Sequence, residues 1–152
     1  MLESSLLNWN DDVIQKSSIN FDKTSKLLYT ILCSFYSDKF KENKYDCEHI
    51  VPRYYLNKIK EANIPGGSLG NLMYLDTNNN RSKKELTLYD QLKPGQKLDK
   101  DFFEFQMYPS KESFEEIRKE IESTSKDYSN LISTIKNRGQ YLINDLINKL
   151  YL

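Results

Sequence analysis

The chain has 152 residues, with 22 basic and 22 acidic side chains, one histidine and no net charge. This length suits one compact domain, and we do not expect two independent ones. Aromatic residues make up 12% of the chain, so it can bury an interior, unlike disordered chains with few aromatics and high net charge. Apolar runs are short and Glu3 stands where a signal peptide would be basic, so we expect a soluble, cytoplasmic protein without a membrane segment.

Cysteine and histidine are scarce. Cys33 and Cys47 do not form a CxxC pair, and we expect both to be reduced. A structural zinc site of four cysteines, or of two cysteines and two histidines, is excluded because the chain lacks the ligands. Any imidazole chemistry must therefore use His49.

Residues 1–44 predict a helical amino-terminal part. The apolar pattern over residues 1–20 predicts a helix interrupted at the polar cluster Asn8–Asp12. Asp22 is placed to cap a second helix, predicted over 22–38 from apolar residues at helical spacing. Its expected apolar face consists of Leu27, Leu28, Ile31, Leu32, Phe35 and Tyr36.

Residues 45–92 predict a strand, a long loop, a second strand and a helix. Pro52 cannot continue a strand ladder, and Arg81–Gln91 contains no helix breaker. The expected elements are a strand at Tyr45–Val51, a short helix near Tyr54–Ala62, a loop at Pro65–Gly67, a strand at Leu72–Leu75 and a helix at Arg81–Gln91.

Residues 99–152 predict a helical carboxy-terminal extension. It begins with the aromatic segment 99–109, which suits either a strand or an irregular apolar cover. Ser113-x-x-Glu116 matches a capping box at the start of a helix. A long amphipathic helix then runs from Tyr128 to the carboxyl terminus, with Gly139 as a weak point or bend.

The charge is unevenly distributed. Residues 39–98 carry 11 basic and 7 acidic side chains, whereas residues 99–128 carry 5 and 9. This asymmetry fits a localised face that binds a polyanion, and a solvated surface of mixed charge fits it equally well.

The segment with the side chains best suited to catalysis is Glu48-His49-Ile50-Val51-Pro52. Neighbouring side chains of a strand point to opposite faces, so Glu48 and His49 can serve one site only if the strand ends there, as Pro52 suggests. A neutral imidazole can take a proton from water, and a carboxylate is a hard oxygen ligand that suits Mg²⁺ or Mn²⁺.

Downstream, Gly70-Asn71-Leu72 opens the second strand, and Asn80 lies nine residues after Asn71. Together with Glu48-His49 and Pro52, this pattern resembles the HNH (ββα-metal) nucleases, most closely the HNH domains of modification-dependent restriction enzymes. The resemblance covers residues 45–90. It implies an α+β fold, in which a ββα hairpin-helix core over 45–92 lies between amino-terminal and carboxy-terminal helices of a single domain over 1–152.

The resemblance also implies roles. His49 would be the general base, and Asn71 would pin the loop that orients it. Glu48 and Asn80 would hold one divalent cation, Mg²⁺ or else Mn²⁺ or another divalent ion. The basic residues that would contact nucleic acid are Arg53, Arg81, Lys83 and Lys84. DNA is the implied substrate, with RNA also open, in restriction or anti-phage defence, where a separate subunit could supply specificity or nucleotide binding.

Other interpretations stay open. Asn78 or Asn79 could replace Asn80 as the ligand, or the three asparagines could form a simple turn. His49 could be an ordinary buried histidine, and Glu48 could pair with a lysine. Arg138 matches an arginine of restriction-type relatives, but we interpret it as a surface arginine. The whole chain could instead be a non-catalytic nucleic-acid-binding module, or an interaction domain that docks through its carboxy-terminal helix.

Overall fold

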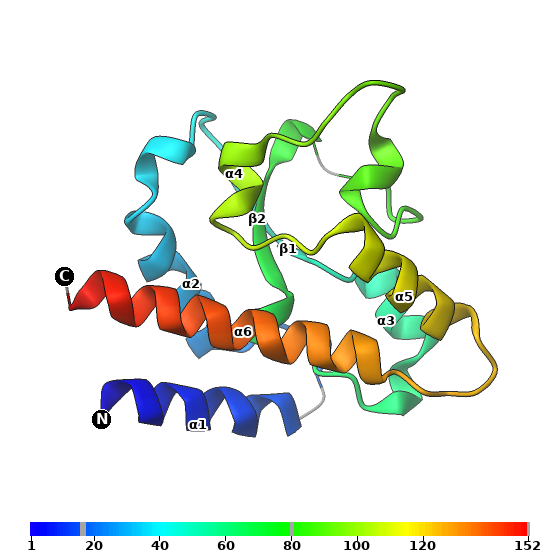
Figure 1. The fold of residues 1–152 in the computed structure, drawn as a ribbon, viewed down its shortest axis with the longest axis horizontal. Helices are drawn as coiled ribbons and strands as arrows, with labels where there is room; N and C mark the ends of the chain where they lie inside the picture. Colours follow the sequence, from blue (N-terminus) through cyan, green and yellow to red (C-terminus); the bar gives the residue numbers. More distant parts are fainter. Residues whose placement is uncertain (16–17, 80, 152) are drawn as a thin grey trace.

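The computed structural model describes residues 1–15, 18–79 and 81–151. Within these residues the protein is a mixed α+β structure of six α-helices and one two-stranded antiparallel sheet (Figure 1), so the expected fold class is confirmed at this level. The elements in order are α1 (Leu2–Gln15), α2 (Lys23–Ser34), β1 (Tyr45–His49), α3 (Arg53–Lys58), β2 (Leu72–Asp76), α4 (Lys100–Glu104), α5 (Lys111–Glu122) and α6 (Ser129–Leu150).

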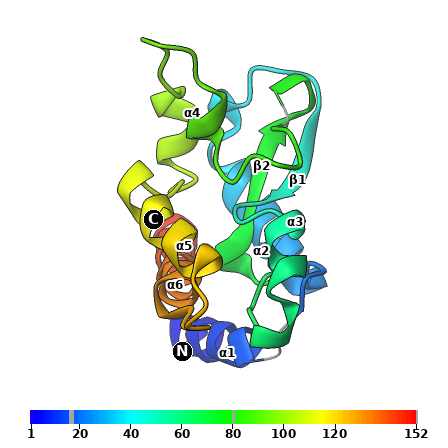
Figure 2. The same ribbon diagram turned by 90° about the vertical axis from the view of Figure 1, so that its right-hand side faces the viewer.

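Helix α6 is the predicted long carboxy-terminal helix. It runs beside α1 in the opposite direction (Figure 1) and, with α4 and α5, lies on one side of the hairpin (Figure 2). Gly139 does not break it. The glycine instead allows α1 to approach, because a Cβ there would lie 2.8 Å from Asn10 Oδ1. The predicted interruption at Asn8–Asp12 is wrong, since α1 is continuous and Asn10 is fully buried.

Helix α2 has the predicted cap, because Asp22 Oδ2 accepts a hydrogen bond of 3.0 Å from Ser25 N. Its buried face differs from the expected one. Tyr29 and Cys33 are buried, whereas Leu27 is 60% exposed. Hydropathy alone missed this face because the Tyr29 hydroxyl finds an internal partner in the side chain of Gln106.

Strands β1 and β2 pair antiparallel, with His49 opposite Leu72 and Tyr45 opposite Asp76. β1 ends two residues earlier than predicted. The other edge of β2 is covered by the Gln106 amide, which accepts from Tyr74 N at 2.8 Å and donates to Tyr74 O at 3.1 Å. The Gln106 side chain thus satisfies the backbone N–H and C=O of Tyr74 at this edge, as a neighbouring strand would do.

The helix predicted at Arg81–Gln91 is wrong. Residues 81–87 are irregular, and only a short 3-10 helix forms at Leu88–Gln91. Local side chains compete for the backbone groups, because Glu85 accepts from Ser82 N and Thr87 forms a reciprocal capping box with Asp90. In the described residues, the hairpin therefore lacks the helix that a ββα core would have after β2.

Two predictions for the carboxy-terminal part also differ from the structure. Residues 99–109 contain the short helix α4, capped by Asp99, where a strand or an irregular cover was expected. α5 begins after Ser110, whose hydroxyl accepts from Ser113 N, so the cap lies three residues before the predicted one. The pattern favoured Ser113 because Glu116 lies three residues after it, but a serine can cap a helix without a glutamate at that position.

Apolar side chains form two adjoining clusters. One joins the hairpin, α3 and α5 to the first half of α6, and includes Ile50, Leu56, Met73, Phe114 and Ile135. The other joins α2 and the start of β2 to the second half of α6, and includes Tyr29, Leu32, Leu72, Leu142 and Leu146. Cys33 and Cys47 are free thiols, as predicted. Every helix in the described part of the chain is too short or too polar to span a bilayer.

Arg138 lies between these clusters, and the interpretation of it as a surface residue is wrong. It is 4% exposed, and no carboxylate among the described residues pairs with it. The guanidinium instead donates to the carbonyl oxygens of Leu69, Gly70, Leu72, Gln106 and Met107 at 2.7–3.3 Å. Burial lowers its pKa, but an arginine this close to carbonyls stays charged.

Replacing Arg138 should therefore be costly. We expect Arg138→Met to lower the free energy of unfolding by about 4 kcal/mol, because several buried carbonyls lose their donor at about 1 kcal/mol or more each. Arg138→Lys should lose about half as much, since an ammonium cannot reproduce the planar fork.

Urea unfolding followed by circular dichroism measures both changes. The matched control is Lys136→Met on the same helix, where the side chain is 46% exposed and pairs with Asp11 at 3.7 Å; it should change stability by less than about 0.5 kcal/mol. Equal losses for Arg138→Met and Lys136→Met would contradict the structural role of Arg138.

Candidate functional site

Glu48 and His49 line the same pocket, although they are neighbours on a strand. β1 ends at His49, and Pro52 then caps the first turn of α3, so the chain turns away after the pair. The pocket has a volume of about 690 Å³. It is lined by Glu48, His49, Pro52, Arg53, Tyr54, Asn57, Arg81, Ser82 and Lys83.

His49 is 6% exposed and held on two sides. Its Nε2 lies 2.6 Å from the carbonyl oxygen of Ile19, and its ring stacks on Phe21 with centroids 3.9 Å apart. Because a carbonyl oxygen only accepts, Nε2 carries the proton and Nδ1 keeps the lone pair of the neutral ring. Burial lowers the pKa of His49 to about 4, helped by Arg53 and Arg81, so the imidazole is neutral at pH 7.

Glu48 is half-buried beside His49. Burial raises the pKa of this carboxyl, and Asp46, two residues earlier on the same face of β1, raises it further, while Arg81 lowers it. A divalent cation would relieve this cost, so the chemistry of the side chain fits a metal ligand. The described residues hold no group of three or more His, Cys, Asp or Glu side chains suited to a metal.

The expected second ligand, Asn80, lies outside the described residues. Asn78 is exposed, does not line the pocket, and donates its backbone N–H to Asp76 Oδ1 at 2.9 Å. The backbone at 77–79 forms a turn of 3-10 helix. The choice of Asn80 therefore stays a prediction.

Asn71 is fully buried and joins three segments. Its Oδ1 accepts from Val51 N at 2.8 Å, and its Nδ2 donates to Gly66 O at 2.8 Å and to Val51 O at 3.3 Å. Its own carbonyl accepts from Ile50 N at 2.7 Å. These bonds hold the loop at Gly66 and the backbone at residues 50 and 51, immediately after His49.

The loop Pro65–Gly67 meets the connector between α1 and α2, a contact that the sequence did not suggest. Gly67 N donates to Ser18 O, and Gly67 O accepts from Asp22 N at 3.0 Å. A Cβ on Gly67 would lie 1.8 Å from Asn20 O, so only glycine allows the two segments to lie this close. The paired glycines, which suggested only a loop, were the available signal.

The four predicted basic residues have different positions. Arg53 and Lys83 are exposed and line the pocket. Arg81 also lines it, but its guanidinium donates to the carbonyl oxygens of His49 and Leu86, which makes it a support of the site. Lys84 is exposed and does not line the pocket, so the structure does not bring it to the site.

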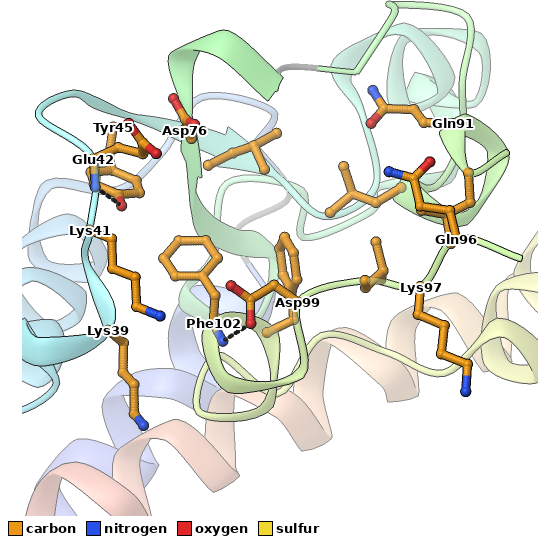
Figure 3. A pocket seen from close by; sticks show the side chains of 15 residues that line it. Lys39, Lys41, Glu42, Tyr45, Asp76, Gln91, Gln96, Lys97, Asp99 and Phe102 are labelled. Atoms are coloured by element: carbon orange, nitrogen blue, oxygen red, sulfur yellow. Dashed lines mark hydrogen bonds between the residues drawn. The ribbon is translucent and has the colours of Figure 1, made fainter.

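A second pocket of about 350 Å³ lies at the other end of the hairpin (Figure 3). Its polar side chains gather on two sides, with Tyr45 and Asp76 on one and Gln91 and Gln96 on the other. None of the predicted site residues that the structure describes lines it. The chemistry predicted from the sequence therefore belongs to the pocket at His49.

No protein-family model, no curated protein and no solved structure matches this chain.

We expect Asn71→Ala to lower the free energy of unfolding by about 3 kcal/mol. The substitution leaves Val51 N, Val51 O and Gly66 O without this partner in a buried place, and unmade buried hydrogen bonds cost about 1–3 kcal/mol each. Urea denaturation measures the loss. Asn57→Ala is the matched control, because Asn57 lines the same pocket but is exposed, and it should change stability by less than about 0.5 kcal/mol. Similar unfolding midpoints for both variants would refute the role of Asn71.

Proposed function

We propose that this protein is a metal-dependent nuclease of the HNH type that hydrolyses phosphodiester bonds of DNA. The observation that carries the proposal is the contact of His49 Nε2 with the carbonyl oxygen of Ile19 at 2.6 Å, which leaves the lone pair on Nδ1, in a pocket that His49 shares with Glu48. A general base needs such a lone pair, and His49 is the one imidazole that the chain has.

In the proposed reaction, His49 Nδ1 takes a proton from the attacking water. A divalent cation, Mg²⁺ or Mn²⁺, held by Glu48 and by Asn80 as the resemblance implies, would offset charge on the phosphate and the leaving oxygen. Arg53 and Lys83 would bind the neighbouring backbone phosphates. Arg81 and Asn71 would act indirectly, by holding the backbone of residues 49–51 in place. Restriction of foreign DNA is the context that the resemblance suggests.

A second candidate is a nucleic-acid-binding module without catalysis. One observation favours it: residues 81–87 form no helix, so this segment directs no partially positive helix amino terminus at the scissile phosphate. This candidate needs the exposed basic residues that line the pocket, Arg53 and Lys83. It needs neither the carboxylate of Glu48 nor a fixed tautomer of His49. It predicts salt-sensitive binding that His49→Ala leaves unchanged.

The first experiment is a nicking assay with supercoiled plasmid and Mg²⁺ or Mn²⁺. We expect nicking that a chelator abolishes and that His49→Ala slows by at least about 100-fold, because a lost general base costs roughly that much. Glu48→Gln should also lose activity, whereas the matched control Glu61→Gln, away from the pocket, should keep it. Equal nicking by the wild type and His49→Ala, or none by either over a range of metals, would refute the nuclease proposal.

The second experiment compares two adjacent lysines. With a chelator present to prevent cleavage, the affinity for a DNA duplex should fall with rising salt. Lys83→Ala should reduce the slope of log affinity against log salt by about 1, because one phosphate contact is lost, and Lys84→Ala should leave it nearly unchanged. Equal changes of the slope in Lys83→Ala and Lys84→Ala would contradict the assignment of the pocket at His49 as the DNA-binding surface.

A further inference from the structure

Residues 18–22, which connect α1 to α2, cover the imidazole of His49. The ring of Phe21 is nearly parallel to it, with an interplanar angle of 17° and centroids 3.9 Å apart. The carbonyl of Ile19 meets Nε2 at the ring edge. The two contacts restrict two different properties of the imidazole. Stacking fixes the plane of the ring, and the carbonyl fixes which nitrogen carries the proton.

The connector is itself held at both ends. Ser18 O and Asp22 N bond to the two backbone groups of Gly67, and Asp22 also caps α2. Gly66, the neighbour of Gly67, accepts from the side chain of Asn71. Phe21 therefore stacks on His49 from a segment tied to the same loop that Asn71 fixes, so both contacts of the imidazole come from one rigid assembly.

We propose that Phe21 is a positioning residue for His49. Without it, the imidazole is free to rotate about its χ2 angle, weaken its bond to Ile19 and distribute its proton over both nitrogens. With it, Nδ1 is kept as the acceptor in one orientation. The effect on catalysis rests on the nuclease proposal, whereas the effect on the imidazole does not.

Because the chain has one histidine, the imidazole can be observed directly. Long-range ¹H–¹⁵N NMR correlation at neutral pH should give a single neutral tautomer in the wild type, protonated at Nε2. Phe21→Ala should shift these signals toward a mixture of tautomers, and Phe21→Tyr should restore the wild-type pattern. Phe35→Ala is the matched control, because Phe35 is 43% exposed on the far end of α2, and it should leave the spectrum unchanged.

The kinetic readout separates positioning from binding. We expect Phe21→Ala to lower kcat for plasmid nicking by about 10-fold or more, as small misplacements of a reacting group do, with KM changed by less than about 2-fold. Phe21→Tyr and Phe35→Ala should stay within about 2-fold of the wild-type kcat. A higher KM with unchanged kcat would overturn the proposal.

Folding of each variant is checked by circular dichroism and the unfolding midpoint. If Phe21→Ala does not fold, Phe21→Leu, which keeps apolar volume without a ring, takes its place. A folded variant with the wild-type tautomer would overturn the proposal, and so would failure of both variants to fold, since Phe21 would then be a core residue. If the wild type does not cleave DNA, the nuclease proposal fails, and the NMR comparison still decides the role of Phe21.

Discussion

The guanidinium of Arg138 holds the entry of β2 against α6. Its donors meet the carbonyls of Leu69, Gly70 and Leu72, so this segment is held from the side of the helix. Gly70 permits the approach, because a Cβ there would lie 1.7 Å from the carbonyl oxygen of Ile135. The same cation reaches the carbonyl of Gln106, whose side chain covers the free edge of β2. A buried cation without a carboxylate is tolerated here because so many carbonyl dipoles face it.

The site depends on this contact through Asn71. Arg138 binds the carbonyls of Gly70 and Leu72, on both sides of Asn71, and the Asn71 side chain bonds to Val51 and Gly66. Val51 follows His49 closely in the chain, and Gly66 leads to the connector over the imidazole. A cation on the last helix is thus linked, through successive hydrogen bonds, to the orientation of the one histidine.

Burial shifts the pKa values of Glu48 and His49 in opposite directions. Burial disfavours the charged form of each, which lowers the pKa of His49 and raises the pKa of Glu48. The imidazole is therefore neutral and keeps a lone pair on Nδ1, whereas a half-buried carboxylate gains from a cation nearby. Arg81 strengthens the first shift and opposes the second, since its positive charge lowers the pKa of both groups: it disfavours protonation of His49 and favours ionisation of Glu48.

The sequence by itself determined the mixed α+β class, the capped helix after Asp22, the hairpin and the long last helix, because each has a local signal of period, cap or breaker. It also singled out Glu48, His49 and Asn71. It misplaced the helix after β2, where local hydrogen bonds of Glu85 and Thr87 compete with helix formation. Only the tertiary structure decided that Arg138 is buried, that Arg81 supports the backbone and that Phe21 stacks on His49. These contacts join residues far apart in the chain, and no local pattern records which distant carbonyl or ring a side chain will meet.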